Sequence, residues 1–223
     1  MLDKTKTDYI LGNDISEYLI KMGVETPMVE NRLSHDEKLN KILNNTKEIL
    51  ETLGLDLKDD SLCETPKRIA KMYLNEVYWG LDYHNFPKIT TITNKMNYET
   101  MLIERGISVK SNCEHHFLPF LGEAYVAYIP NNTIIGLSKI NRIVEFFSRR
   151  PQVQERLTEQ IFHALCYILG TNNVAVCVRA FHTCVRVRGV EDTNSDTITS
   201  RLGGLFLEGT ALRNEFYQSV NLK

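Results

Sequence analysis

Two short clusters of cysteine and histidine carry the strongest chemical signal in this 223-residue sequence. The first is Cys113-Glu-His-His116, and the second is His182-Thr-Cys184. Cysteine and histidine are ligands that zinc prefers, and a Cys-x-x-His spacing lets two side chains from one turn meet at one ion. Together the two clusters predict a zinc site.

The make-up of the clusters favours catalytic zinc over structural zinc. A structural site uses four protein ligands, usually in two spaced pairs. The neighbours His115 and His116 point in opposite directions on an extended chain, so we do not expect both to bind the same ion. Cys113, His116 and Cys184 would leave one position open for a water, whose pKa zinc lowers to about 7. His115 and His182 would remain free for proton transfer.

The other three cysteines, Cys63, Cys166 and Cys177, lie in apolar patterns and are expected to be packed inside the protein. The amino-terminal stretch contains no apolar signal region, and nothing approaches the roughly 20 apolar residues of a membrane helix. An odd number of cysteines without a secretory signal indicates a reducing compartment. We therefore expect a cytoplasmic protein with no membrane partner.

The charge distribution suggests an anionic substrate. The overall formal charge is −2, but residues 139–188 contain eight basic and three acidic residues, so this stretch is +5 and the remainder is −7. A basic segment with a metal site suits a polyphosphate, while the near-neutral total argues against a dedicated nucleic-acid binder. Gly203-Gly204 is not followed by the Gly-Lys-Ser/Thr of a phosphate-binding loop. Glu155, beside Gln154 at a predicted helix start, could accept hydrogen bonds from a base.

The elements that must position these residues fall into two parts. Helical signals dominate the first third: one helix from Asp14 to Gly23, one after the capping box Ser34–Glu37 that closes at Gly54, and one beginning at Thr65-Pro66. We expect a helical region over 1–95 and a catalytic domain over 96–223.

The second part mixes helices and strands. The patterns predict strands over 122–130, 174–187 and 197–207, and helices over 151–169 and 211–220. Without regular βαβ alternation, the class is α+β. In the strand over 174–187, a period of two puts His182 and Cys184 on one face with Arg186 and Arg188. The apolar face changes there from even to odd positions, which predicts a bulge or a polar-lined site.

Four motifs together resemble the GTP cyclohydrolase I family, in the family's order and spacing. They are Cys113-Glu-His-His116, Gly136-Leu-Ser-Lys-Ile-Asn-Arg142, Arg150-Pro-Gln-Val-Gln-Glu-Arg-Leu-Thr158 and His182-Thr-Cys-Val-Arg-Val-Arg-Gly189. Thr65-Pro-Lys-Arg68 also matches, and the resemblance spans essentially the whole chain. Thr183 stands where Met or Tyr is common in the family, which we expect to be tolerated.

The resemblance implies conversion of GTP and water to 7,8-dihydroneopterin triphosphate and formate, the entry to folate or tetrahydrobiopterin synthesis. It implies a zinc (Zn2+) site formed by Cys113, His116 and Cys184, with the activated water attacking C8 of the purine. His115 would protonate the opening imidazole ring, and His182 with Ser138 would assist rearrangement of the ribose.

The resemblance also implies substrate-binding roles. Glu155, with Gln154, would recognise the guanine edge. The triphosphate would be bound by four basic residues, the last from a neighbouring subunit: Lys139, Arg142, Arg188 and Arg68. The implied fold is the tunnelling fold, an antiparallel sheet with helices on one face, preceded here by an N-terminal helical extension. The implied assembly is a toroidal homodecamer with active sites at subunit contacts.

Two other functions stay open at this point. A different zinc hydrolase acting on a purine or pterin, such as a nucleobase deaminase, would share the metal chemistry, but the Cys-x-x-Cys of deaminases is missing from the sequence. A structural-zinc module could instead use the basic stretch on nucleic acid, which predicts no turnover and a strongly salt-dependent affinity.

Overall fold

The structure, a computed structural model, describes residues 2–220, and these residues form two compact units. One unit is Pro27–Trp79, and the other consists of Asp3–Thr26 together with the chain from Gly80 onward. Residues 80–95 therefore belong to the same compact unit as the sheet. The boundary expected at residues 95/96, between a helical region and a catalytic domain, stays a prediction.

The helices and strands have the following bounds. The helices are α1 (Tyr9–Met22), α2 (His35–Thr52), α3 (Thr65–Met72), α4 (Leu137–Ser148), α5 (Gln154–Leu169), α6 (Thr183–Arg186), α7 (Leu205–Glu208) and α8 (Thr210–Val220). The strands are β1 (Thr91–Thr93), β2 (Leu102–Cys113), β3 (Pro119–Tyr128), β4 (Thr133–Ile135), β5 (Pro151–Gln152), β6 (Val174–His182) and β7 (Thr197–Leu202).

The helical unit contains α2 and α3, and the local signals for both are confirmed. The Ser34 side chain accepts from the backbone N–H of Glu37, whose carboxylate in turn accepts from the Ser34 backbone, so the capping box is present. Pro66 lies in the first turn of α3. Two apolar side chains at the end of α2, those of Ile49 and of the C-cap residue Leu53, are 60% and 70% exposed.

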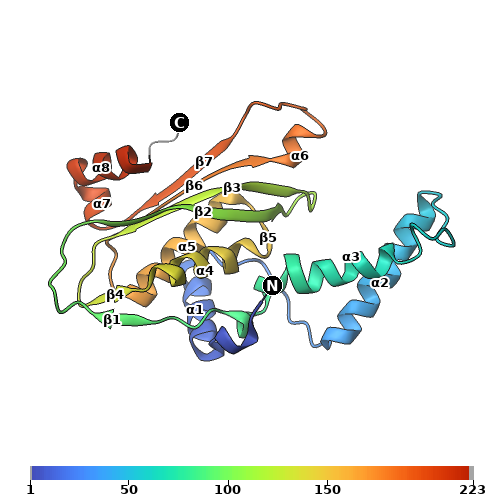
Figure 1. Cartoon of the computed structure of the whole chain (residues 1–223), viewed down its shortest axis with the longest axis horizontal. Helices are drawn as coiled ribbons and strands as arrows, with labels where there is room; N and C mark the ends of the chain where they lie inside the picture. Colours follow the sequence, from blue (N-terminus) through green and yellow to red (C-terminus); the bar gives the residue numbers. More distant parts are fainter. Residues whose placement is uncertain (1, 221–223) are drawn as a thin grey trace. The chain divides into compact units, whose positions relative to one another are not determined.

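The second unit is built on a five-stranded sheet with the order β5-β2-β3-β6-β7 (Figure 1). Its long strands pair antiparallel, and only the two-residue β5 runs parallel to its neighbour β2. The predicted α+β class is confirmed. The sequence patterns missed β2 and α4, although buried and exposed residues alternate along β2 from Ile107 to Cys113.

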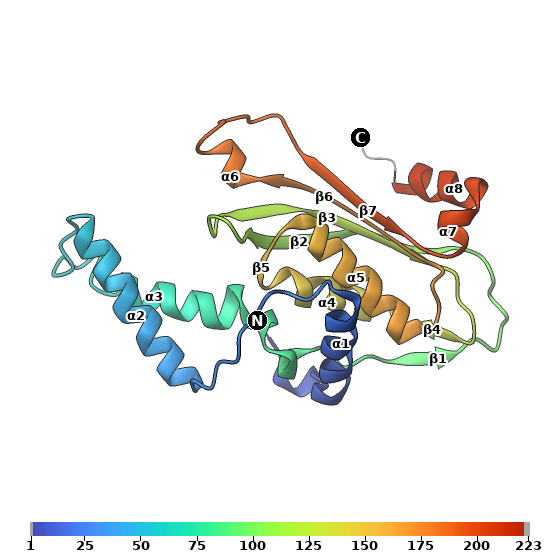
Figure 2. The same ribbon diagram turned by 180° about the vertical axis from the view of Figure 1, so that it is seen from behind.

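Helices cover the two faces of this sheet unequally. α4 and α5 lie along one face, as expected, and α7 with α8 lies against the other face in both views (Figures 1 and 2). Ala175 and Cys177 of β6 pack in one buried cluster with Phe206 and Phe216 of the terminal helices. Residues 174–178 of β6 are therefore buried on both faces, which explains why this first part of the strand is apolar throughout.

Two predicted boundaries near the candidate site are wrong. The helix expected from Pro151 begins at Gln154, because Pro151 and Gln152 form β5 against the end of β2. The strand expected over 174–187 ends at His182, and residues 183–186 form the helical turn α6. The partner strand β3 begins at Pro119, whose nitrogen carries no hydrogen for a further ladder bond beyond the Phe120–His182 pair.

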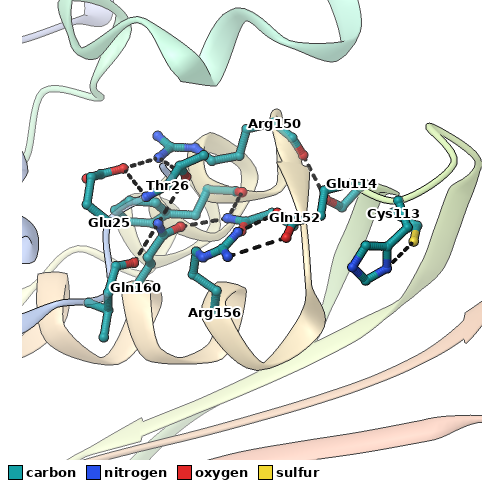
Figure 3. Close-up of polar contacts among 12 residues, drawn as sticks. Glu25, Thr26, Cys113, Glu114, Arg150, Gln152, Arg156 and Gln160 are labelled. Carbon is teal, nitrogen blue, oxygen red and sulfur yellow. Dashed lines mark hydrogen bonds and ion pairs between the residues drawn. The ribbon is translucent and has the colours of Figure 1, made fainter. Parts of the chain in front are cut away.

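A single buried cation ties the framework of this unit together. Arg150 is 0% exposed, and its guanidinium donates to the Glu25 carboxylate (3.1 Å), the Thr26 hydroxyl (3.3 Å) and the Gly80 carbonyl (Figure 3). Its Cζ lies 4.9 to 5.2 Å from the centroids of three rings, those of Tyr83, Phe146 and Phe147. Thr26 and Gly80 are the residues where the chain leaves and re-enters this unit. Arg150 thus donates a hydrogen bond to each of the two residues at which the chain leaves and re-enters this unit, and it directly precedes β5.

Replacing Glu25 by alanine should lower the free energy of unfolding by about 3 kcal/mol or more, because it leaves a buried guanidinium without its counter-charge. Urea denaturation followed by circular dichroism measures the loss. The control is Glu145→Gln, which removes the half-exposed ion pair with Arg149 (3.5 Å) and should cost no more than about 1 kcal/mol. Equal losses in the two variants would contradict the role given to the buried pair.

Candidate metal centre

The three predicted metal ligands lie close together in the structure. One side-chain donor atom each from Cys113, His116 and Cys184 lies within 4.8 Å of the other two. Two ligands bound to a tetrahedral zinc at the usual 2.0–2.3 Å are roughly 3.5 Å apart, so the group needs only a small contraction to hold one ion. The two sulfurs and one imidazole nitrogen suit a metal such as zinc. The site is therefore a candidate metal centre.

The metal loop, which we define as residues 113–118, joins β2 to β3 and carries two of these donors. Its ends are closed by backbone hydrogen bonds from Cys113 N to the Leu118 carbonyl and from Phe117 N to the Cys113 carbonyl, both 2.8 Å. Phe117 has a φ of +53°, which turns the chain sharply for a non-glycine residue. The loop sends His116 toward the other donors, while His115 Nδ1 lies 3.7 Å from Cys113 Sγ.

Cys184 reaches the group from α6 and not from a strand. The predicted common strand face for His182 and Cys184 is wrong, because the chain leaves the sheet between them. The Thr183 hydroxyl donates to the Pro119 carbonyl and holds the start of α6 against β3. Burial raises the pKa of Cys184, the neighbouring Cys113 raises it further, and the Arg188 guanidinium acts in the opposite direction.

His182 is fixed on two sides at the end of β6. Its ring stacks on Phe120 with centroids 4.6 Å apart, and its Nε2 lies 2.8 Å from the Gln154 side-chain oxygen. Burial lowers the pKa of His182, and the nearby Glu155 carboxylate partly offsets that effect. The imidazole is thus a half-buried group of defined orientation next to the candidate metal centre.

Gln154 and Glu155 are adjacent in sequence but differ in what they can bind. Gln154 is 2% exposed, and its side-chain nitrogen donates to the carbonyls of Val178 and Thr197, both at 3.0 Å. Its oxygen faces His182, so its polar atoms are already engaged within the protein. Glu155 is exposed in the first turn of α5 and is open to a ligand.

Contacts that the sequence did not reveal hold the metal loop to β5 and α5 (Figure 3). The Arg156 guanidinium contacts both carboxylate oxygens of Glu114, and the Glu114 backbone N–H donates to the Gln152 carbonyl (3.1 Å). The Gln152 side chain in turn donates to the Gln160 side-chain oxygen (2.6 Å). The two residues of each of these contacts are 8 to 42 positions apart in the sequence, so no local spacing pattern could have predicted the contacts.

Ser138, predicted to act on the ribose, and two of the predicted phosphate-binding residues, Lys139 and Arg142, lie apart from the metal centre. Ser138 and Lys139 begin α4, whose last turn leads through Arg150 into β5 beside Cys113. With a rise of 1.5 Å per residue, they are roughly 15 Å along the helix from the end that approaches the metal loop. Arg142, four residues after Ser138, lies on the same side of α4.

Two other basic residues have different positions. Arg188 follows α6 and is close enough to Cys184 to influence the pKa of that thiol. Arg68 is exposed in α3, in the other compact unit.

Two hollows in the described part of the chain are lined by other residues. One, of about 320 Å³, lies between β2 and α4 at Lys110 and Glu145, and another, of about 740 Å³, lies at Glu123 and Arg179 on the face opposite α4 and α5. Neither is lined by the three donor residues. Cys113 is buried, Cys184 is half-buried and His116 is exposed, so the metal centre lies at the edge of the protein surface in a single chain.

Comparison with known proteins identifies the family of this sequence. The profile of the family described as GTP cyclohydrolase I matches residues 42–221. A GTP cyclohydrolase 1 from Enterobacter sp. (strain 638) is 55% identical over 208 residues, which cover 92% of this chain and 94% of that protein. Proteins of the same name from Aeromonas salmonicida (strain A449) and Yersinia enterocolitica are 57% and 52% identical, over 87% and 92% of this chain and 89% and 94% of their own lengths. Within residues 2–220, no helix is both long and apolar enough to cross a membrane.

Cysteine reactivity should separate the three remaining thiols. The expectation that Cys63 is packed is wrong, because it is exposed, with its Sγ 3.5 Å from the Asp60 carbonyl. Burial raises the pKa of Cys166 to about 12 and that of Cys177 to about 11. At pH 8 only about one Cys177 in a thousand is then a thiolate, which is the reactive form.

Iodoacetamide at pH 8 should therefore label Cys63 in the native protein and label Cys166 and Cys177 only after unfolding. Peptide mass spectrometry at several reaction times measures the rates. Equal native rates at Cys63 and Cys177 would show that the core around β6 is open.

Proposed function

The chain belongs to the GTP cyclohydrolase I family, and we propose that it converts GTP and water to 7,8-dihydroneopterin triphosphate and formate at a zinc site. One observation carries the proposal. Donor atoms of Cys113, His116 and Cys184 converge from two distant segments, beside two imidazoles and an exposed carboxylate. Three protein donors, in place of the four of a structural site, favour catalysis.

Each histidine near the metal centre has a distinct proposed task. Zinc held by Cys113, His116 and Cys184 would supply hydroxide at neutral pH for attack on C8 of the purine. His115, beside Cys113, would give a proton to the imidazole-ring nitrogen as that ring opens. His182, oriented by Phe120 and Gln154, would act with Ser138 on the ribose during the later rearrangement.

Glu155 would select guanine. A carboxylate only accepts hydrogen bonds, and guanine offers two donors on one edge, its N1–H and its amino group. Adenine has an acceptor at N1, which would face the carboxylate without a hydrogen and weaken binding. Because the Gln154 amide is engaged within the protein, we assign the base contact mainly to Glu155.

The triphosphate site would require more than one copy of the chain. Arg188 is near Cys184, whereas Lys139, Arg142 and Ser138 begin a helix whose other end leads to the metal loop. We propose that a neighbouring copy brings its α4 start, and its Arg68, to the metal centre. A homo-oligomer with sites at subunit contacts follows, and the decamer implied by the sequence resemblance is the proposed assembly.

The zinc-loaded protein should release formate from GTP and form a product that becomes fluorescent on oxidation to neopterin triphosphate. ATP under the same conditions should give neither signal. No product from an intact, zinc-replete oligomer would refute the proposed reaction, and salt-sensitive binding of RNA or DNA in its place would favour the nucleic-acid module.

Replacing Glu155 by alanine should abolish measurable GTP binding and leave the zinc content unchanged, because this side chain accepts from the base and is not among the metal donors. Isothermal titration with GTP and metal analysis provide the two readouts. Glu145→Ala, which changes an exposed carboxylate of α4, is the matched control and should bind GTP normally. Normal GTP binding by the Glu155 variant would exclude the recognition role.

Substitutions at the metal centre should separate ligand from acid. Cys184→Ser should lower the zinc content, while His115→Ala should retain zinc and lose turnover. Metal analysis and the formate assay on both variants test this assignment, and the reverse pattern would mean that the two roles are exchanged.

A further inference from the structure

We infer that Arg156 is a positioning residue, which holds the metal loop in its ligand-binding shape through the carboxylate of Glu114. The inference deepens the proposed function and rests on it for the role of the metal. It assigns a task to two charged residues that are not among the metal donors.

The first step is that α5 provides a fixed base. Gln154 at its start donates to the carbonyls of Val178 in β6 and Thr197 in β7, and the hydroxyls of Thr158 and Thr199 lie 2.7 Å apart. These contacts join two turns of the helix to two neighbouring strands. Side chains that project from this part of α5 therefore start from a backbone of defined position.

The second step is the contact between Arg156 and Glu114. The two guanidinium nitrogens each contact one carboxylate oxygen, the longer contact being 3.4 Å, which is the two-pronged geometry that arginine forms with carboxylates. The side chains are 20% and 25% exposed, so solvent screens the pair less than it screens a surface ion pair. The pair thus restrains direction as well as distance.

The third step is the place of Glu114 in the metal loop. It stands between Cys113 and His115, and two residues before His116, the other metal donor of this loop. Its backbone N–H donates to the Gln152 carbonyl while its side chain is held by Arg156. A residue held through both backbone and side chain fixes the direction of the chain on either side of it. His115 and His116 are themselves exposed, so their orientation depends on the backbone that carries them.

Loss of the contact between Arg156 and Glu114 is therefore expected to weaken metal binding. A loop held in the binding shape needs no further ordering when the ion arrives, whereas a released loop must lose conformational freedom at that moment. Changes to residues that orient metal ligands typically weaken metal affinity roughly 10- to 100-fold. We expect the lower end of this range, because Glu114 acts through the backbone and not through a hydrogen bond to a ligand.

The experiment is a double-mutant cycle read by zinc affinity in competition with a chelator, without GTP. Glu114→Gln, Arg156→Gln and the double variant are compared in the full chain. Each single change should weaken zinc binding roughly tenfold, and the double variant should be no weaker than either single one, because the interaction is lost once. The charge-reversed pair Glu114→Arg with Arg156→Glu should recover part of the loss.

The matched control is the neighbouring ion pair of α5. Arg201 Nε lies 3.3 Å from the Glu159 carboxylate, one turn further along the helix, and neither residue contacts the metal loop. Glu159→Gln and Arg201→Gln should leave the zinc affinity unchanged. Arg156→Lys retains the charge but not the two-pronged contact, and it should show an intermediate loss. It keeps the test decisive if Arg156→Gln does not fold.

The possible outcomes separate this inference from the proposed function. Native zinc affinity in the Arg156 variants, or losses that add in the double variant, would overturn the positioning role even if the native protein converts GTP. A coupled loss of affinity would support the role even if the native protein did not convert GTP. Equal losses in the control variants would show a general effect of α5 stability and would also overturn it.

Discussion

The buried guanidinium of Arg150 is the constraint on which the arrangement around the metal loop depends. A cation without solvent needs a counter-charge and hydrogen-bond acceptors, and here Glu25, Thr26 and Gly80 supply them from three places in the sequence. Meeting this requirement fixes where α4 ends and where β5 begins. Since β5 pairs with the last residues of β2, the position of Cys113 follows from the burial of Arg150.

The first turn of α5 distributes three consecutive side chains among three tasks. Neighbouring residues of a helix point about 100° apart, so Gln154, Glu155 and Arg156 reach in different directions from one backbone. Gln154 orients His182, Glu155 is exposed to solvent, and Arg156 holds Glu114. A short motif can in this way connect the sheet, the proposed substrate edge and the metal loop. The same geometry explains why Gln154 is buried beside an exposed Glu155.

In a single chain the parts of the proposed site lie apart. The metal donors and His182 lie at one end of the sheet, whereas the start of α4 lies roughly 15 Å along that helix from the same end. The apolar side chains of Ile49 and of the C-cap residue Leu53, at the end of α2, are likewise exposed in one chain. This separation fits the proposal that neighbouring copies complete each site. In such an assembly, the metal donors of one copy would be joined by the start of α4 from another copy.

The sequence by itself determined the residue types of the metal centre, the α+β class and the helices whose ends carry local signals. The capping box at Ser34 and the stop at Gly170 are satisfied within a few residues, so their patterns are visible along the chain. Only the tertiary structure decided that β6 ends at His182, that Pro151 lies in a strand and that Gln154 is engaged by the sheet. These outcomes depend on partners brought together by folding: the proline start of β3, the edge of β2 and the carbonyls of β6 and β7. Local spacing cannot encode them, because the free energy that selects them comes from contacts between residues far apart in the chain.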